Sequence, residues 1–571
     1  MKFLLSPLQA LVTSLLLIWL VIANPSFLQS VELKFFDQLI VSDKVEAKDT
    51  VLIDIGERSL ERYGQYPFER NVYGDLIERL RAANAGVIVF NMSFPEEDRT
   101  GNDESFKNML GSGVVIAHFP STQTDGRAAY TTGIVEVGPR AINFVPIYGG
   151  IAANISEYES RVSGIGIANT IPEIDGVVRR LPMISAVDET LYPSIVLEIL
   201  KVYMGTNTYQ VKSNEYGLEA VRVKGFPTIN TDGSSRIWIN PNYNFKRYEM
   251  TEEFPDLNGA TVFIGVTAEG ISNPVPTATG AVFGHEITAK AFTSVVNSYN
   301  ITSPILSDAI KILSIAVLSI SIVALSYVRL GWAVSISAIA YALIFPFQQF
   351  YSSLELYNTA IPALMSILVF AHVYGLKYGQ EYFAKMRIKK QFGGYASPEV
   401  VEILQKNPEL IKQGIKREVS ICFSDLRGFT PLGESFGDDV KGLTEVMNGY
   451  MDAITKPVLD ARGMIIKYIG DASMHIHNAP VEDPDHPKTA VQTGLNMLKA
   501  VEKFNEQLIE KGRPKVGMGA GINTGLGYIG EMGSTARHSY DVLGDAVSTA
   551  ARVESKCKEY GCLLLIGENT Y

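Results

Sequence analysis

The sequence predicts a multidomain membrane protein that joins an α/β domain, a set of transmembrane helices and an α+β domain. Three observations lead to this fold class. The chain has 571 residues, 46% of them hydrophobic, and a mean hydropathy of +0.11, so it is too long for one domain and too apolar for a disordered protein. Residues 4–23 and about 310–376 are nearly free of charge. The segments between and after these apolar runs alternate between strand-like and helix-like patterns.

The charge balance and the cysteine count exclude two classes of protein. Lys and Arg number 50 against 61 Asp and Glu, a formal net charge of −11, whereas nucleic-acid-binding proteins usually carry a basic domain or stripe. The three cysteines, Cys422, Cys557 and Cys562, all follow the last apolar run. One chain can therefore build neither a disulfide framework nor a four-cysteine zinc site, and we expect no nucleic-acid partner.

The second apolar region predicts three transmembrane helices, each close to the ~20 residues that cross ~30 Å of hydrocarbon. In chain order they are Ile310–Val328, Trp332–Phe350 and Tyr357–Leu376. A buried helical hairpin in a soluble protein is the alternative, which three nearly uncharged runs in succession disfavour. Five cations follow the third run: Lys377, Lys385, Arg387, Lys389 and Lys390. By the positive-inside rule, the C-terminal part is expected in the cytoplasm.

The N-terminal run from Leu4 to Ala23 predicts a signal anchor, with a cleaved signal peptide as the alternative. In both cases the following segment lies outside the cell, and three later spans bring the tail inside. We expect a multi-pass protein of the inner (plasma) membrane. Its parts are an N-terminal anchor at 1–23, an external domain at 24–304, three spans at 305–376, a cytoplasmic connector at 377–416 and a cytoplasmic domain at 417–571.

The external segment opens with a strand, a helix and a strand. Val51–Ile55 and Gly86–Phe90 are apolar runs, and residues from Val72 to Ala83 hold helical spacing between them. This order predicts a βαβ unit and a largely parallel sheet. Further strands are expected at Gly113–Phe119 and Thr261–Val266, and helices at Pro193–Tyr203 and His285–Val296. Four polar residues are interpreted as isolated caps, turn residues or satisfied polar groups rather than ligands: Asp54, Glu57, Asp175 and His285.

Four phrases of this segment resemble the second class of CHASE extracellular sensor domains of bacterial receptors. They are Val51-Leu-Ile-Asp-Ile, Gly64-Gln-Tyr-Pro-Phe-Glu-Arg, Asp175-Gly-Val-Val-Arg-Arg and Gly284-His-Glu-Ile-Thr-Ala. The resemblance covers about residues 28–300. It implies a sensory role and leaves the external stimulus open.

In the connector, Ser397 is expected to cap a helix that has Pro398 at its first position and Glu399 in its first turn. A plain linker is the alternative. Beyond the connector, the elements follow the order βαββαβ, which predicts an α+β sandwich. The expected elements are a strand at Glu418–Asp425, a helix at Val440–Leu459, a hairpin centred on Gly470-Asp471, a helix at Thr489–Lys511 and a strand at Val516–Asn523.

Two carboxylates mark the candidate site of this domain. Asp425 and Asp471 each end a predicted apolar strand, where a side chain can leave the sheet and reach a ligand. Two such oxygen donors brought together suit divalent cations of the magnesium class.

Three phrases around these residues resemble the catalytic domain of class III nucleotidyl cyclases. They are Phe423-Ser-Asp-Leu-Arg-Gly-Phe-Thr, Lys467-Tyr-Ile-Gly-Asp-Ala and Tyr540-Asp-Val-Leu-Gly-Asp-Ala-Val-Ser-Thr-Ala-Ala-Arg. The resemblance covers Arg417 to Tyr571. It implies a ferredoxin-like fold, a homodimer, and conversion of a nucleoside triphosphate to its 3′,5′-cyclic monophosphate and pyrophosphate.

The resemblance also implies roles for individual residues. Asp425, Asp471 and the backbone carbonyl of Leu426 would bind two Mg²⁺ (or Mn²⁺) ions. Arg552 would stabilise charge on the α-phosphoryl group. Ser548, one helical turn before it, occupies a position where the family commonly has Asn, so its contact with the ribose is in doubt.

Lys467 and Asp541 occupy the two positions at which the family reads the purine base. Adenine offers an amino donor at N6 and an acceptor at N1, which a carboxylate and an ammonium group satisfy, so this pair predicts ATP as substrate. The resemblance implies that the metal carboxylates and the base-reading pair of one site come from different protomers. The expected partners are therefore ATP, a second copy of the chain, membrane lipid and an unidentified stimulus.

Several alternatives stay open at this point. Ser548 and an end at Tyr571, which leaves the cyclase domain C-terminally incomplete, support a catalytically weak or inactive receptor that binds nucleotide or a partner. The presence of Asp425, Asp471, Lys467, Asp541 and Arg552 disfavours this alternative. A diguanylate cyclase is disfavoured because its Gly-Gly-Asp/Glu-Glu-Phe loop is replaced by Arg462-Gly-Met-Ile-Ile-Lys. A zinc site at His475 and His477 lacks an evident third ligand. A transport or adhesion role is least favoured, because the spans carry few polar side chains.

Overall fold

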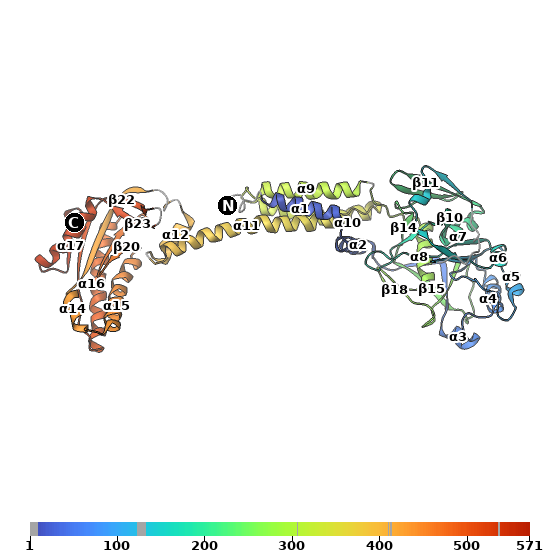
Figure 1. The fold of residues 1–571 in the computed structure, drawn as a ribbon, viewed down its shortest axis with the longest axis horizontal. Coiled ribbons are helices and arrows are strands. Elements are labelled where there is room, and N and C mark those ends of the chain that lie inside the picture. The colour runs from blue at the N-terminus through green and yellow to red at the C-terminus, as the bar shows by residue number, and fades with distance from the viewer. Residues whose placement is uncertain are drawn as a thin grey trace. The chain divides into compact units, whose positions relative to one another are not determined.

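A computed structural model of the chain describes residues 9–122, 133–304, 306–394, 396–408, 410, 414–534 and 537–571 (Figure 1). The chain divides into two compact units, Met1–Leu376 and Lys377–Tyr571. The boundary between the units falls inside the longest helix, α11 (Ala360–Phe392). Each unit is described by itself below.

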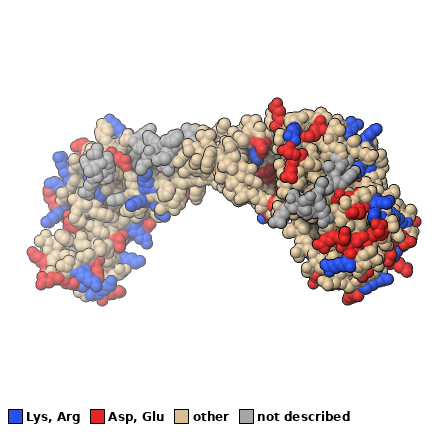
Figure 2. Space-filling view, turned by 45° about the vertical axis from the view of Figure 1, so that its right-hand side comes forward, with Lys and Arg blue, Asp and Glu red and all other residues tan. Residues whose placement is uncertain are grey.

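The three predicted transmembrane helices are confirmed, with shifted ends. They are α9 (Ser307–Leu325), α10 (Gly331–Ser353) and α11, and each is long and apolar enough to cross a membrane. On the face in view, the surface of these helices carries few charged side chains (Figure 2). α11 has 33 residues, more than a bilayer requires, so the helix runs on through the first part of the predicted connector.

The N-terminal region forms two helices with a sharp bend between them. α1 (Gln9–Ala23) and α2 (Ser26–Ile40) meet at 81°, and the pair would add a fourth span if it counts as one broken helix. The bend falls at Asn24, whose φ is +46°, and at Pro25, which cannot continue a helix. α1 packs on the membrane helices, with Ala10 against Ile322 and Val373. Residues 1–8 of the predicted anchor lie outside the described residues.

The α/β domain of the first unit contains a seven-stranded sheet in the order β15-β1-β16-β2-β3-β6, with β7 also paired to β3. All of these pairs are parallel except β3 with β6, which confirms the largely parallel sheet. The strands are β1 (Val45–Ile55), β2 (Val87–Phe90), β3 (Val114–Ser121), β6 (Gly150–Ala152), β7 (Gly164–Ile167), β15 (Tyr243–Glu249) and β16 (Thr261–Val266). β1 and β2 do not pair with each other, because β16 from the end of the domain inserts between them.

Helices cover both faces of this sheet because the strand side chains alternate. Ile53 and its neighbours on one face pack against α4 (Arg70–Ala82). Leu52 on the other face packs with α7 (Ile195–Met204) and α8 (Gly284–Val296). The remaining elements of this unit are α3 (Glu57–Tyr63), α5 (Asp103–Met109), β4 (Gly133–Val137), η1 (Ala141–Asn143), β5 (Ile147–Tyr148), α6 (Ser156–Glu159), β8 (Arg180–Pro182), β9 (Ile184–Val187), β10 (Thr190–Pro193), β11 (Thr208–Asn214), β12 (Gly217–Val223), β13 (Ile229–Asn230), β14 (Arg236–Trp238), β17 (Val275–Thr277) and β18 (Gly280–Val282).

The second unit contains a six-stranded sheet in the order β20-β21-β19-β22-β23, with β24 parallel to β22. Its first four strands and two long helices follow the predicted βαββαβ order, and the resulting sheet is ferredoxin-like. The elements are β19 (Ile415–Arg427), α14 (Phe429–Phe436), α15 (Val440–Asp460), β20 (Met464–Ile469), β21 (Ala472–His477), α16 (His486–Glu510), β22 (Gly517–Ser534), β23 (Arg537–Leu543), α17 (Asp545–Glu559), β24 (Leu564–Ile566) and η2 (Glu568–Thr570).

β22 extends well beyond the predicted end at Asn523, and its glycines explain how α17 packs on it. A Cβ atom at Gly521 would lie 2.1 Å from the backbone nitrogen of Glu554, so only glycine allows this approach of the helix to the strand.

The connector forms the predicted capped helix, α12 (Pro398–Lys406). The Ser397 hydroxyl accepts a hydrogen bond of 3.3 Å from the backbone N–H of Val400. Val400 and Leu404 are buried against the sheet, so this segment is part of the folded domain rather than a plain linker. Residues 395, 409 and 411–413 of the predicted connector lie outside the described residues.

Candidate active site

Asp425 and Asp471 lie at neighbouring strand tips. Asp425 on β19 pairs with Ala472, the first residue of β21, and Asp471 directly precedes Ala472 in the turn from β20. Antiparallel partners are separated by ~5 Å and chain neighbours by 3.8 Å, so the Cα atoms of the two aspartates are no more than about 9 Å apart. The β19–β21 register therefore brings together two carboxylates that are far apart in the sequence.

The electrostatics of this pair fit a cation. Burial raises the pKa of Asp425, and the nearby charge of Asp471 raises it further, because two adjacent carboxylates repel each other when both are ionised. A bound divalent cation removes that repulsion. Among the described residues, no group of three or more His, Cys, Asp or Glu side chains could hold a metal ion. A cation here would thus take the two carboxylates together with backbone or ligand oxygens.

Two further residues lie in the electrostatic field of this pair. Burial raises the pKa of Glu554 on α17, with Asp425 contributing next. Burial also raises the pKa of Tyr450 on α15, with Asp425 and Asp471 contributing next. The Tyr450 hydroxyl is buried and has no hydrogen-bond partner in the described part of the chain. The position of Glu554, two residues after Arg552, is a sequence signal that could have marked it as a candidate site residue. Nothing in the sequence distinguishes Tyr450 from a core residue.

Lys467 and Asp541 contact each other directly. Lys467 Nζ lies 2.7 Å from Asp541 Oδ2, although β20 and β23 are the opposite edges of the sheet. The two edge strands contact each other at this point. The side chains are 44% and 19% exposed, so the pair is accessible to a ligand.

Ser548 and Arg552 lie one turn apart on the exposed side of α17. The opposite side of this helix, with Ala546, Ala550 and Cys557, is buried against the sheet. Within the described ranges, Arg552 forms no ion pair. Its guanidinium group is therefore free to meet an anion from outside the chain.

His475 and His477 are both buried, and their ring centroids are 5.6 Å apart. Burial lowers the pKa of His475 well below its usual value and that of His477 to about 4. No described side chain completes a third ligand. Both imidazoles are neutral core residues.

The interpretation of Asp54 and His285 as isolated residues was wrong. His285 Nε2 lies 2.8 Å from Asp54 Oδ1, and Arg247 Nη1 lies 3.1 Å from Asp54 Oδ2. Burial lowers the pKa of His285, so the ring is neutral beside an ionised carboxylate. The contact forms because α8 begins over the ends of β1 and β16, where Gly265 has no side chain to exclude the imidazole. Such a contact between residues 231 positions apart leaves no local sequence signal.

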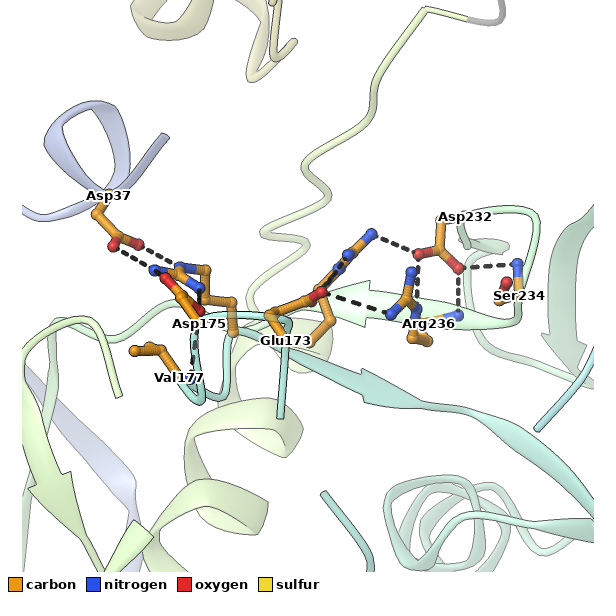
Figure 3. Close-up of polar contacts among 9 residues, drawn as sticks. Asp37, Glu173, Asp175, Val177, Asp232, Ser234 and Arg236 are labelled. Carbon is orange, nitrogen blue, oxygen red and sulfur yellow. Dashed lines mark hydrogen bonds and ion pairs between the residues drawn. The ribbon is translucent and has the colours of Figure 1, made fainter. Parts of the chain in front are cut away.

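Asp175 is not isolated either, because it belongs to a network that holds α2 against the external domain (Figure 3). Arg179 pairs with Asp37 of α2 at 2.6 and 2.7 Å and with Asp175 at 2.8 Å through two nitrogens. The next residue, Arg180, pairs with Glu173 at 2.6 Å and with Asp232 at 2.8 Å. The two arginines of the Asp175–Arg180 phrase thus have structural partners, and the first of them fixes the position of α2.

The ferredoxin-like sheet, the paired aspartates and the charged pair at the sheet edges define a nucleotidyl cyclase domain, attached through membrane helices to an α/β domain. Comparison with known families agrees with this class. The CHASE2 domain matches residues 12–325, and the adenylate and guanylate cyclase catalytic domain matches residues 411–564. The chain belongs to the CHASE2 domain family and carries a C-terminal adenylate/guanylate cyclase catalytic domain.

Individual relatives match the cyclase region. An adenylate cyclase of Anabaena cylindrica is 34% identical over 157 residues, which are 27% of this chain and 30% of the relative. Adenylate cyclase 1 of Rhizobium meliloti is 30% identical over 168 residues, 28% of this chain and 25% of the relative. The chain thus spans 25–30% of the length of these curated relatives. The solved adenylyl cyclase CyaB from P. aeruginosa is 30% identical, covers 28% of this chain and 81% of that chain, and has a TM-score of 0.26.

Proposed function

We propose that this protein is a receptor adenylate cyclase, which converts ATP to 3′,5′-cyclic AMP and pyrophosphate under the control of its CHASE2 domain. The observation that carries the proposal is the register of β19 and β21, which brings Asp425 and Asp471 to neighbouring strand tips. The curated relatives named above are adenylate cyclases, which supports ATP over GTP.

The residues at the strand tips would bind the catalytic cations. Asp425, Asp471 and the backbone carbonyl of Leu426 would hold two Mg²⁺ or Mn²⁺ ions, which when bound lower the pKa of the ribose 3′-hydroxyl and neutralise triphosphate charge. Arg552 donates hydrogen bonds to the α-phosphoryl group as negative charge develops there. Ser548 lies on the same side of α17 and contacts the ribose.

Base recognition falls to Lys467 and Asp541. The Lys467 ammonium donates to adenine N1, and the Asp541 carboxylate accepts from the N6 amino group. Guanine presents a donor at N1, which would face the Lys467 donor, and an acceptor at O6, which would face the Asp541 acceptor. The mismatch leaves polar groups unpaired, which is the strongest basis for rejecting a substrate analogue.

The active form is a homodimer. In the proposed arrangement, one protomer supplies the metal carboxylates and its partner supplies the base-reading pair, so two chains form two sites and a single chain forms none. The exposure of Ser548 and Arg552 supports this arrangement, because both side chains face away from their own domain.

The external domain lies outside the plasma membrane, and the cyclase domain lies in the cytoplasm. Lys377 and the cations that follow it support this orientation through the positive-inside rule. The stimulus reaches the cyclase through the membrane helices, where a small rotation can assemble or separate the two-chain site.

The test is nucleotide turnover by the purified full chain with ATP and GTP in competition and with Mg²⁺ or Mn²⁺. We expect cyclic AMP as the main product and loss of product in Asp425→Ala. Cyclic GMP as the main product would refute the substrate. Nucleotide binding without either product would identify the inactive receptor that Ser548 leaves open.

A further inference from the structure

The end of the last membrane helix contacts the strands that carry the base-reading pair. Phe392, the final residue of α11, is 1% exposed and packs edge-on against Tyr540 of β23, with ring centroids 5.8 Å apart at 77°. Tyr540 directly precedes Asp541. The contact therefore lies one residue from a group that is proposed to read the base.

The same segment contacts the other edge strand. Ala396, four residues beyond Phe392, forms a bridge with Met464 of β20. Phe392 belongs to one buried cluster with Met464 and Ile466, and Ile466 directly precedes Lys467. The end of α11 thus packs on both edge strands beside the point where the Lys467–Asp541 ion pair joins them.

The packing around this contact leaves room for movement. A cavity of about 110 Å³ is lined by Gln391, Phe392, Met464, Ile465, Ile466, Ser539 and Tyr540. The Tyr540 hydroxyl is buried beside it without a hydrogen-bond partner among the residues described. Protein cores are otherwise close-packed, so the cavity gives the Tyr540 ring volume to move into when Phe392 is displaced.

We infer that Phe392 is a positioning residue, which through Tyr540 and Ile466 holds Asp541 and Lys467 at the separation that an adenine edge requires. The inference rests on the proposed function, and it identifies the base-reading pair as the part of the site on which the connector acts. Displacement of the end of α11 changes nucleotide affinity and base selectivity, whereas the metal carboxylates on β19 and beside β21 stay in place. Phe392 itself does not touch the nucleotide.

The first test compares Phe392→Ala with a matched control on the same helix. Phe383 is 70% exposed, and its ring contacts only Tyr382 among the described aromatic residues, so Phe383→Ala removes an equal side chain without touching the edge strands. In the full-length protein, we expect Phe392→Ala to raise the KM for ATP by about three- to tenfold, which corresponds to the loss of one aromatic pair contact. The kcat of Phe392→Ala should stay within about twofold of the wild-type value, and so should both the KM and the kcat of Phe383→Ala. A fall in kcat with unchanged KM would overturn the inference.

A second pair of variants keeps the test informative if Phe392→Ala does not fold. Tyr540→Leu removes the ring and should raise the KM for ATP and lower the ATP-to-GTP preference. Tyr540→Phe keeps the ring, removes only the unpartnered hydroxyl, and should leave both values unchanged. Equal effects of the two Tyr540 variants would overturn the inference, because the hydroxyl rather than the ring contact would then be responsible.

Binding separates this inference from the proposed function. The probe is N-methylanthraniloyl-ATP, whose fluorescence reports nucleotide binding without turnover. If the wild-type chain makes no cyclic nucleotide, the proposed activity fails, and weaker probe binding by Phe392→Ala still supports the positioning role. If the wild-type chain makes cyclic AMP and Phe392→Ala matches it in KM, base preference and probe affinity, the positioning role fails alone.

Discussion

The ammonium group of Lys467 and the carboxylate of Asp541 are 2.7 Å apart, although their strands form opposite edges of a sheet. The pair is preformed in a single chain. Preorganised partners lose less entropy when a ligand binds, so under the proposed function an adenine edge would meet a donor and an acceptor already held at a fixed separation.

Reversing the polarity of this pair should reverse base choice. The double variant Lys467→Glu/Asp541→Ser places an acceptor opposite guanine N1 and N2 and a donor opposite O6. We expect the ratio of kcat/KM for ATP to that for GTP to fall by about 100-fold or more. Competition assays with both nucleotides measure this ratio, and each single variant serves as a control. Survival of ATP preference in the double variant would contradict base reading by these residues.

Removing one carboxylate at the strand tips should abolish turnover and stabilise the metal-free protein. Asp425→Asn should lower kcat by about 100-fold or more, because metal assistance contributes several kcal/mol, and should abolish Mn²⁺ binding measured by electron paramagnetic resonance. The pKa of Asp425 is raised in the folded state. Its contribution to stability is thus present at low pH and lost as pH rises through the folded-state pKa. The neutral amide should therefore raise the midpoint temperature of unfolding of the metal-free protein. A lower midpoint would contradict the charge repulsion.

Placing an amide at position 548 should raise turnover. Ser548 is exposed on α17, and its hydroxyl is shorter than the Asn side chain that the resemblance to class III cyclases implies at this position. Ser548→Asn should increase kcat by about two- to twelvefold, since a well-placed hydrogen bond to the neutral ribose contributes about 0.5–1.5 kcal/mol. Ser548→Ala should reduce kcat, and steady-state kinetics at saturating ATP measure both. No gain in Ser548→Asn would exclude the ribose contact as the limiting factor.

The CHASE2 domain should lose stability below neutral pH because of His285. Burial lowers the pKa of this fully buried ring below 6.5, so the unfolded chain binds a proton before the folded chain does. The stabilising contribution is present above pH 6.5 and is lost as pH falls below that value, by up to ~1.4 kcal/mol per pH unit. Denaturation of the full chain at pH 7.5 and 5.5 measures the effect. The difference in the free energy of unfolding between pH 7.5 and pH 5.5 should be smaller in His285→Asn than in the wild type. An unchanged difference would show that other groups cause the pH dependence.

Breaking the Arg179 network should release α2. Arg179→Met leaves the carboxylates of Asp37 and Asp175 without their shared cation and should cost about 3–5 kcal/mol. Asp37→Asn should cost less, because Arg179 keeps Asp175, and the double variant should show a coupling of ~1–3 kcal/mol. The rings of Trp238 and Phe36 of α2 have centroids 5.9 Å apart. The other two tryptophans, Trp19 and Trp332, lie in α1 and α10, so with both replaced by Phe the remaining fluorescence reports the contact of α2. Additive effects would show that Asp37 and Arg179 do not stabilise the protein through their contact, which would contradict the network.

Local patterns predicted much of the fold. Long uncharged runs predicted the three membrane helices, and Ser397 with Pro398 predicted the cap of α12, because helix length and capping depend on residues close in the chain. The ends of α11 were not predicted, since its helix continues past the apolar run into a charged segment that still has good helix formers.

The sequence by itself determined the membrane helices, the α/β and α+β classes of the two domains, and their resemblance to sensor and cyclase families. Each of these depends on hydropathy, periodicity and residue type within a short window. Only the tertiary structure decided that β16 inserts between β1 and β2, that His285 meets Asp54, that Arg179 holds α2, and that Phe392 packs behind Asp541. Each of these contacts joins residues more than a hundred positions apart, and strand register, sheet twist and close packing, which act on the folded chain as a whole, bring them together.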